Sequence, residues 1–447
     1  MQLSRRKFFT LAGASAAGTL MMSPLEALYA RKANGESVFG GGYGPLVPDP
    51  NGLLDLPQGF QYRAFSRTGE MMSDGSPVPG GHDGMAAFPG PQNTIILVRN
   101  HELSPNSTTQ VVGPNPYDPL CKGGTTTLQV GPNRQLIKHY VSLSGTYRNC
   151  AGGPTPWGSW ITSEEDVSTL ATNRPRPNDA RNVSKSHGYN FEVPALATAP
   201  VNPVPLVAMG RFNHEAVAID PKTGIVYETE DRGDGLFYRF IPNEVKNLSA
   251  GGTLQALKIK NMPQAKTFAG FPKGQPMSVE WVTIDNPDPA TDTVRVEGFG
   301  KGAAQFTRGE GIWYGNREVY FCCSNGGSVD PATGRPNGFG QVWRYLPDQD
   351  MIELFVEAKS ADELDGPDNI VVAPHGDLII CEDGEDEQFV VGVTPNGELY
   401  RFAKNALNDR EFAGACFSPD GRTMFVNIQT PGITFAIWGP WKSQRGA

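Results

Sequence analysis

The sequence predicts an all-β protein, a β-propeller of about six blades with long insertions between its strands. Two observations support this prediction. Glycine and proline are frequent, at 53 and 38 of 447 residues, which is typical of many short strands joined by turns. In addition, a hairpin phrase of two apolar strands around a tight turn recurs six times. Because radial repetition protects sheet edges, we prefer a propeller to the competing β-sandwich.

The first thirty residues have the pattern of an export signal. They carry the motif SRRKFF, an apolar Ala/Gly-rich run at 10–22 and a small residue, Ala30, at the end. This is the twin-arginine pattern. We therefore expect residues 1–30 to be a signal peptide read by the twin-arginine export machinery, and 31–447 to form a single β-propeller domain. The mature protein is expected to be periplasmic or secreted, with no stable membrane anchor.

The six hairpin units follow one another in chain order, and most of them end in acidic residues. They span residues 82–102, 152–166, 214–231, 310–325, 368–383 and 414–430. Their turns include PKTG, YGNR, PHGD and SPDG, which are tight-hairpin sequences. Equivalent strands of successive blades end on the same side of the propeller axis, so we expect their terminal residues to converge.

The converging residues are mostly acidic and predict a metal site. The expected group at one mouth of the axis is Glu102, Glu164, Glu165, Glu230, Asp231, Glu382 and Asp383, joined from the opposite strand ends by Glu215, Glu310 and Asp368. Carboxylates packed this closely raise one another's pKa and are best accommodated by cations. Their hard oxygen atoms favour calcium, with ligands supplied from scattered loops because no EF-hand loop is present.

Cys150 is the cysteine best placed to be a ligand. It precedes a Gly-Gly-Pro turn rather than lying inside an apolar strand. A single cysteine is more often a small buried hydrophobe, but a thiolate beside carboxylates would indicate a transition metal such as iron. The six cysteines show no CxxC spacing, so neither a zinc knuckle nor a disulfide scaffold is indicated.

The histidines do not form a recognisable zinc motif. Neither His101 nor His214 belongs to HExxH or another two-histidine spacing, so zinc is not expected. His214 is either a ligand or a residue that orients one. The remaining histidines are interpreted as turn or surface residues: His82, His139, His187 and His375.

Composition and missing motifs exclude several classes of function. The net charge is −9, and losing the three positive and one negative residues of the signal makes it more acidic still. An acidic protein is a poor match for nucleic acid, which is bound through clustered lysine and arginine. The chain also lacks GxSxG, Walker and strand–GxGxxG–helix motifs, so serine hydrolases, P-loop NTPases and Rossmann enzymes have no support.

Several longer strings resemble the hallmark segments of the PhoX alkaline phosphatase family. They are NCAGGPTPWGSWITSEED, GRFNHEAVAIDPKTGIVYETED, RGEGIWY, DGPDNIVVAPHGDLIICED and FSPDGRTMFVNIQTPGITFAIWGPW, and the resemblance spans residues 41–441 in the family's order. It implies an exported phosphomonoesterase that releases inorganic phosphate from small-molecule phosphate esters with a mixed iron and calcium cluster in the propeller axis.

The resemblance also implies roles for individual residues. Cys150 matches the family's iron-binding thiolate, and Glu215 and Glu310 match glutamates that hold iron or calcium. Glu164, Glu165 and Asp231 match acidic positions around calcium, and Arg308 matches the arginine that grips the substrate phosphate. Together with Asp368 and Glu382 from the convergence argument, these residues make up the expected site. Arg308, Cys150 and Glu310 are expected to be catalytic.

Two alternatives to a phosphatase remain open. One is a calcium-dependent lactonase or organophosphate-type hydrolase on a similar propeller, which would need one hard ion and have no obvious use for Cys150 or Arg308. The other is a non-catalytic propeller that uses calcium to tie its blades together.

Overall fold

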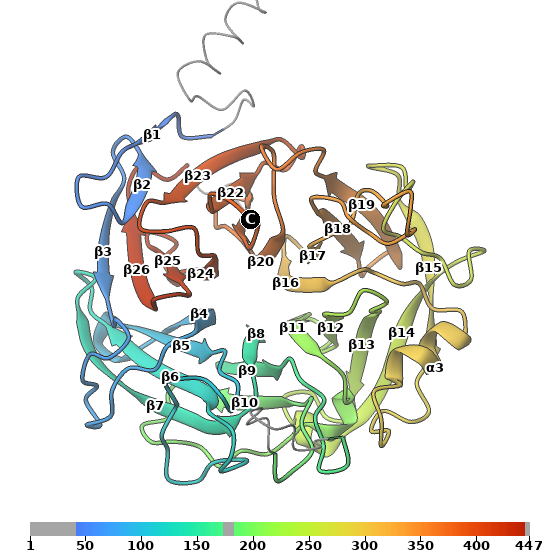
Figure 1. The fold of residues 1–447 in the computed structure, drawn as a ribbon, viewed down its shortest axis with the longest axis horizontal. Coiled ribbons are helices and arrows are strands. Elements are labelled where there is room, and N and C mark those ends of the chain that lie inside the picture. The colour runs from blue at the N-terminus through green and yellow to red at the C-terminus, as the bar shows by residue number, and fades with distance from the viewer. Residues whose placement is uncertain (1–41, 173–182, 443–447) are drawn as a thin grey trace, which may run out of the picture. The chain divides into compact units, whose positions relative to one another are not determined.

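The computed structural model describes residues 42–172 and 183–442. The predicted signal peptide, residues 1–30, lies outside the described residues. Those described fall within one compact unit, in which short sheets are arranged around a central axis (Figure 1). In these two ranges, no helix has both the length and the apolar character needed to cross a membrane.

The strands of the described ranges form five hydrogen-bonded sheets. In hydrogen-bonding order, one four-stranded sheet is β4 (His82–Pro89), β5 (Ile95–His101), β6 (Gly123–Val130) and β7 (Leu136–Thr146), and the three-stranded sheet is β10 (Asn190–Pro194), β9 (Ser159–Glu164) and β8 (Asn149–Pro154). The nine-stranded sheet is β11 (His214–Ile219), β12 (Val226–Glu230), β13 (Phe237–Pro242), β14 (Gly252–Ile259), β15 (Met277–Thr283), β19 (Met351–Glu357), β18 (Gln341–Leu346), β17 (Glu318–Cys323) and β16 (Gly309–Gly315). The six-stranded sheet is β1 (Leu46–Val47), β2 (Leu54–Pro57), β23 (Leu399–Asn405), β22 (Phe389–Val393), β21 (Leu378–Glu382) and β20 (Pro367–Val372). The second four-stranded sheet is β24 (Phe412–Phe417), β25 (Met424–Ile428), β26 (Ile433–Trp438) and β3 (Gln61–Phe65).

Helices are few and short within 42–172 and 183–442. They are α3 (Val294–Gly300) and the 3-10 turns η1 (Pro91–Asn93), η2 (Val207–Met209) and η3 (Leu248–Ala250). The all-β, propeller-like arrangement predicted from the repeated hairpins is therefore confirmed.

The first strands of the six hairpin units line the axis. These ring strands are β4, β8, β11, β16, β20 and β24; each packs against the next, and β24 packs against β4, which closes the ring (Figure 1). The approach is close enough to require glycine. A Cβ atom on Gly84 of β4 would lie 2.6 Å from the Cα of Ala151 in β8, and one on Gly311 of β16 would lie 2.6 Å from the carbonyl oxygen of Asp368 in β20.

The number of sheets differs from the six predicted units. β15 pairs with β14 on one side and with β19 on the other. The units that begin at β11 and β16 are therefore joined into one nine-stranded sheet, and hydrogen bonding separates five sheets rather than six.

The two ends of the described chain are built into shared sheets. β3 pairs with β26, with Ala64 opposite Phe435, and β2 pairs with β23. Strands from the N-terminal part of the domain thus form the outer strands of sheets whose other strands come from its C-terminal part. This pairing closes the ring.

One apolar cluster of the core lies between the two halves of the nine-stranded sheet, β11–β15 and β16–β19. Alternate strand residues face it, as expected from the two-residue period of a strand. Phe237, Phe321 and Trp343 are fully buried there, and the rings of Phe237 and Phe321 stack with centroids 4.5 Å apart. This packing fixes the positions of the ring strands that carry the polar residues described next.

Candidate metal centre

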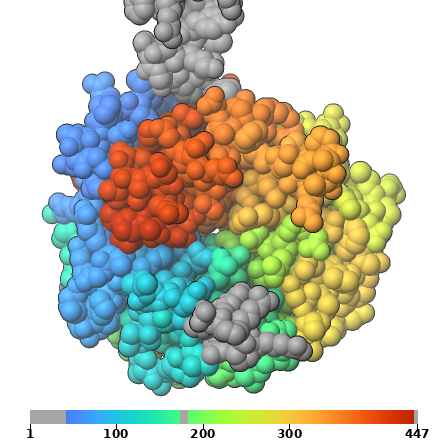
Figure 2. Space-filling model, in the orientation of Figure 1, coloured from blue at the N-terminus to red at the C-terminus, as the bar shows by residue number. Residues whose placement is uncertain are grey.

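Polar residues from all six hairpin units converge on one cavity of about 400 Å³. Its lining is Asp83, Glu102, Arg148, Cys150, Glu165, Glu215, Asp231, Arg308, Glu310, Ser324, Asp368, Asp383, Glu411 and Gln429. Among the described residues it thus has nine carboxyl groups, one thiol and two guanidinium groups. In the space-filling view, successive parts of the chain surround a narrow opening at the centre of the face shown (Figure 2).

An inner layer of this lining comes from β-bulges in the ring strands. In β4, β8, β11, β16 and β20 the pairing register with the second strand shifts by a bulge, and its first residue lines the cavity. These residues are Asp83, Cys150, Glu215, Glu310 and Asp368. A bulge re-aims one side chain out of the regular ladder. β24 has the same bulge at Gly414, and there Glu411 lines the cavity instead.

An outer layer comes from the residues that directly follow the second strand of each unit. They are Glu102, Glu165, Asp231, Ser324, Asp383 and Gln429, after β5, β9, β12, β17, β21 and β25 respectively. The convergence predicted from the repeat is therefore present, and it involves two equivalent positions in each unit.

Two predicted metal ligands, Glu164 and Glu382, do not line this cavity. Glu164 is fully buried and accepts hydrogen bonds from the backbone N–H groups of Tyr147 and Gly188. Glu382 accepts them from Asp365 and Phe389. Successive side chains of a strand point in opposite directions. The second residue of each acidic pair, Glu165 or Asp383, therefore lines the cavity.

The remaining predicted ligands do line the cavity: Cys150, Glu165, Glu215, Asp231, Glu310 and Asp368. Asp83, Arg148, Ser324, Glu411 and Gln429 were not singled out from the sequence. Asp83 could have been found from its equivalent place, because HDG in the first unit stands where PDN stands in the fifth.

Burial and mutual repulsion raise the pKa values of the cavity carboxyls. Burial is the largest cause for Glu215 and Glu310, followed by the neighbouring charges of Glu310 for the first and Asp231 for the second. For Asp368, burial and the charge of Asp383 raise the pKa to about 8. The same causes raise the pKa of the Cys150 thiol well above its usual range. Bound cations would reverse this balance by stabilising the ionised forms.

Two overlapping groups of donors could each hold a cation. Cys150, Glu165 and Glu215 offer ligand atoms that all lie within 4.8 Å of one another, and so do Glu215, Glu310 and Asp368. Glu215 belongs to both groups. The first combines a soft thiol with carboxylates, whereas the second contains only hard oxygen atoms.

Two arginines border the cavity. Arg308 contacts Asp231 and Glu310, both at 3.0 Å, and Arg148 contacts Glu102 at 2.6 Å and Glu165 at 2.8 Å. Each stands two residues before the bulge residue of its ring strand. Each also has a positive φ, 47° and 50°, a backbone conformation that is unusual for a residue other than glycine. The guanidinium groups remain partly exposed, so they are accessible to a ligand in the cavity.

The histidines lie elsewhere. His214 is buried, with Nδ1 3.3 Å from Glu228 Oε2, and it does not line the cavity. Its carbonyl oxygen lies 3.5 Å from Cys150 Sγ, so it is a neighbour of a candidate ligand. The interpretation of His82, His139 and His187 as turn or surface residues is wrong, because all three are buried among polar partners. His375 does lie in a turn, but it too is buried.

The fold and the site define a class of protein: a β-propeller whose axis opens into a carboxylate-rich cavity with donor sets for cations and two arginines beside them. The chain belongs to the alkaline phosphatase PhoX family, whose model matches residues 41–432. It is thus an enzyme of the phosphatase class, and the resemblance seen in the sequence is confirmed.

One solved structure supports this fold. The chain is similar to Pseudomonas fluorescens PhoX in complex with vanadate, a transition-state analogue, with 18% sequence identity, coverage of 90% of this chain and 98% of that chain, and a TM-score of 0.69. A gluconolactonase from Xanthomonas campestris matches more distantly, with 11% identity, coverage of 89% and 98%, and a TM-score of 0.42. No curated protein sequence matches the chain.

Proposed function

We propose that this protein hydrolyses phosphate monoesters with a mixed iron and calcium centre in the propeller axis. The observation that carries the proposal is the pair of donor groups sharing Glu215, placed beside two accessible arginines. A cavity of this kind can neutralise a phosphoryl group from several sides, although the protein as a whole is acidic.

The chemistry of the donors supports this choice of metals. Cys150, Glu165 and Glu215 would hold iron, because a thiolate favours a transition metal. Glu215, Glu310 and Asp368 would hold calcium, which prefers several oxygen ligands, and Asp83, Asp231, Asp383 and Glu411 offer further carboxylates for additional ions. When bound, such cations supply Lewis acidity and an activated oxygen nucleophile.

Arg308 is proposed to bind the substrate phosphate. Its planar guanidinium group can donate two parallel hydrogen bonds to phosphoryl oxygens. Asp231 and Glu310 hold the group over the cavity from two sides, so it would be oriented before substrate arrives. Arg148 lies in an equivalent position of another unit and is a second candidate for phosphate contact.

We also propose the architecture and location that the sequence suggests. Each of the six ring strands would begin one blade, so that the nine-stranded sheet counts as two blades joined by β15. Residues 31–447 would form this single domain, and the twin-arginine pattern at 1–30 would send it to the periplasm or outside the cell.

The test is hydrolysis of an aryl phosphate by protein purified after export, with metal analysis of the same sample. Cys150→Ala should lose iron, whereas Arg308→Ala should keep its metals and lose at least about 100-fold in kcat/KM. Matched controls are Cys416→Ala, a buried thiol that does not line the cavity, and Arg335→Ala, an exposed arginine. Full turnover by chelated, metal-free protein would refute the proposal, as would an iron- and calcium-loaded protein without turnover.

A further inference from the structure

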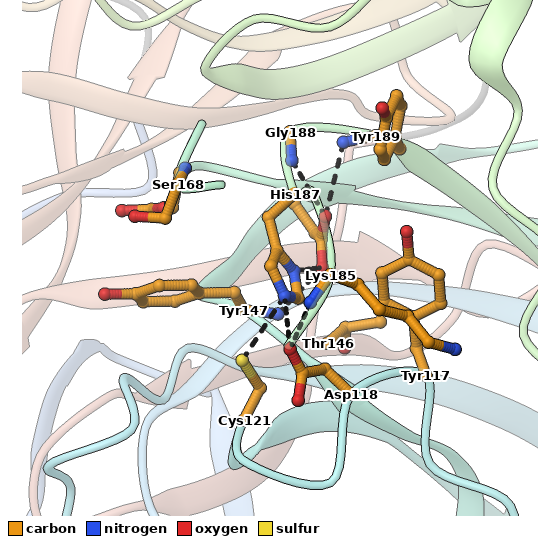
Figure 3. A network of polar contacts seen from close by, with 12 residues as sticks. Tyr117, Asp118, Cys121, Thr146, Tyr147, Ser168, Lys185, His187, Gly188 and Tyr189 are labelled. Atoms are coloured by element: carbon orange, nitrogen blue, oxygen red, sulfur yellow. Dashed lines mark hydrogen bonds and ion pairs between the residues drawn. The ribbon is translucent and has the colours of Figure 1, made fainter. Parts of the chain in front are cut away.

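A second group of metal-binding side chains lies outside the cavity. Asp118, Cys121 and His187 come together between two loops and the end of β9 (Figure 3). All three side chains are buried, at 0%, 2% and 0% exposure respectively. None of them lines the cavity described above, and the proposed phosphatase reaction uses none of them.

The distances between the three donors fit a tetrahedral metal. His187 Nε2 lies 3.5 Å from Cys121 Sγ and 3.3 Å from Asp118 Oδ2. Zinc, with bonds of about 2.3 Å to sulfur and about 2.0–2.2 Å to nitrogen and oxygen, keeps such ligand atoms about 3.3–3.6 Å apart. Both distances from His187 Nε2 thus match those around one zinc ion, and the Cys121 and Asp118 ligand atoms lie within 4.8 Å of each other.

The groups behind His187 orient it as a ligand. Its Nδ1 lies 2.7 Å from Glu164 Oε1, and Glu164 is itself fixed by the N–H groups of Tyr147 and Gly188. A carboxylate that already accepts from the backbone holds the proton on Nδ1 and leaves the Nε2 lone pair directed at Cys121 and Asp118. This carboxylate–histidine arrangement is the usual support of a zinc-bound imidazole.

Asp118 and Cys121 are held just as firmly. They are the first and fourth residues of a turn with Pro119 at its second position, closed by the Cys121 N–H donating to the Asp118 carbonyl at 3.1 Å. The Asp118 carboxylate accepts hydrogen bonds from the N–H groups of Leu120 and Lys185. A ligating carboxylate is normally supported in this way.

Burial excludes a nucleophilic role for this cysteine. A thiol, an imidazole and a carboxylate in series could otherwise activate sulfur for attack. The rings of Tyr117 and Tyr147 lie edge-on to His187, with centroids 5.4 Å and 5.5 Å away, and Cys121 has almost no exposed surface. Substrate therefore cannot reach the sulfur, whereas a small ion enclosed during folding needs no such access.

We propose that Asp118, Cys121 and His187 form a structural zinc site, with Glu164 as the residue that positions His187. The fourth position would fall to a water molecule, because the second oxygen of Asp118, Oδ1, already accepts hydrogen bonds from the Leu120 N–H and the Ser184 hydroxyl. The site ties the loop carrying Asp118 and Cys121 to the segment at 183–188 and to the end of β9. Because Glu165 follows Glu164 directly and lines the axial cavity, the zinc site would also steady that edge of the catalytic pocket.

The metal-free alternative is a doubly protonated His187 held between Asp118 and Glu164, with no role for Cys121.

The zinc site and this metal-free arrangement can be distinguished in Cys150→Ala protein, in which the axial cavity contributes no sulfur ligand. Chelator-treated full-length protein is given one equivalent of Zn²⁺ and examined by zinc-edge X-ray absorption, and Co²⁺ is used in parallel as an optical probe. We expect a sulfur shell at about 2.3 Å and a sulfur-to-cobalt charge-transfer band.

The second part of the experiment replaces one of the proposed zinc ligands. Cys121→Ser in the same background should abolish the sulfur shell and the cobalt band and weaken zinc binding at least about tenfold, whereas Cys416→Ala should change none of these. A sulfur shell or band that persists in Cys121→Ser would overturn the proposal. If Cys121→Ser does not fold, the Cys150→Ala spectrum decides alone, because zinc without any sulfur ligand would also overturn it. Neither outcome depends on phosphatase activity, so failure here is distinct from failure of the proposed function.

Discussion

A single residue step decides which carboxylates reach the axial cavity. At the end of β21, Glu382 turns into the sheet and accepts two backbone hydrogen bonds, whereas Asp383 lines the cavity. The same division separates Glu164 from Glu165 and Glu230 from Asp231. The first member of each pair stabilises a strand end, and the second is available to a cation.

The pair at β21 gives a matched prediction. Glu382→Gln should lower the free energy of unfolding by about 1–3 kcal/mol, since one carboxylate oxygen that accepts a buried N–H is replaced by an amide nitrogen. The folded variant should keep its metals. Asp383→Asn should leave the metal-free protein at least as stable as the parent, because it removes the like charge beside Asp368, and should reduce calcium affinity. Urea unfolding and calcium titration on both variants distinguish the roles, and loss of calcium from Glu382→Gln with no change in Asp383→Asn would reverse them.

Sequence reasoning found the acidic pairs but did not separate their members consistently. It chose Asp231 correctly, kept both Glu164 and Glu165, and chose Glu382 where Asp383 lines the cavity. The repeat indicates that strand ends converge, and this holds for Glu165, Asp231 and Asp383. It does not give the exact strand end, and a one-residue shift sends a side chain to the other face. Buried histidines were misread for a related reason: the partners of His187 come from residues 118 and 164, which no local pattern brings together.

At the scale of elements, the bulge at the start of β4, β8, β11 and β16 performs two tasks. It directs one side chain toward the cavity, and it leaves a small residue after it, such as Gly84, Ala151, Ala216 or Gly311, where the strands approach closely. The ligands of the inner layer and the tight packing of the ring are therefore one structural feature. A larger residue at the second bulge position would push two ligand-bearing strands apart.

Gly311 tests this coupling. Gly311→Ala places a Cβ atom 2.6 Å from the Asp368 carbonyl oxygen, and we expect a loss of about 1–3 kcal/mol in the free energy of unfolding together with weaker metal binding. Gly300→Ala is the matched control, because nothing lies within 4 Å of its added Cβ at the end of α3. Unfolding curves and metal titrations are the measurements. Equal stability of the two variants would show that the ring tolerates wider spacing.

Local hairpins were predictable at this scale, and long-range pairings were not. Turn sequences such as PKTG and SPDG identify strands that are neighbours in the chain. The pairing of β3 with β26 joins residues 61–65 to 433–438, and β15 bridges two units. Both join segments that are far apart in the sequence, so no local sequence period indicates them.

At the scale of the whole molecule, cation binding and folding are expected to be coupled through charge. The ring brings nine carboxyl groups together against two guanidinium groups. Folding without metal must therefore either protonate some of these groups or keep like charges close together. Folding with metal avoids both costs, which makes the axial ions part of the structure as well as of the proposed chemistry.

This coupling predicts a pH dependence that metals should remove. In the metal-free protein, burial and Asp383 raise the pKa of Asp368 to about 8, and burial raises those of Glu215 and Glu310. At these groups the folded state then binds more protons than the unfolded state above about pH 4. Their contribution to stability is therefore greatest at low pH and falls as pH rises toward about 8, by up to about 1.4 kcal/mol per pH unit for each group. Metal-loaded protein keeps these carboxylates ionised and should show a much flatter dependence of stability on pH.

Urea unfolding at about pH 5, 6.5 and 8 measures this dependence with and without metal. Asp368→Asn is expected to flatten it in the metal-free protein. Parallel profiles with and without chelator would mean that the cavity carboxylates do not bind the ions that stabilise the fold.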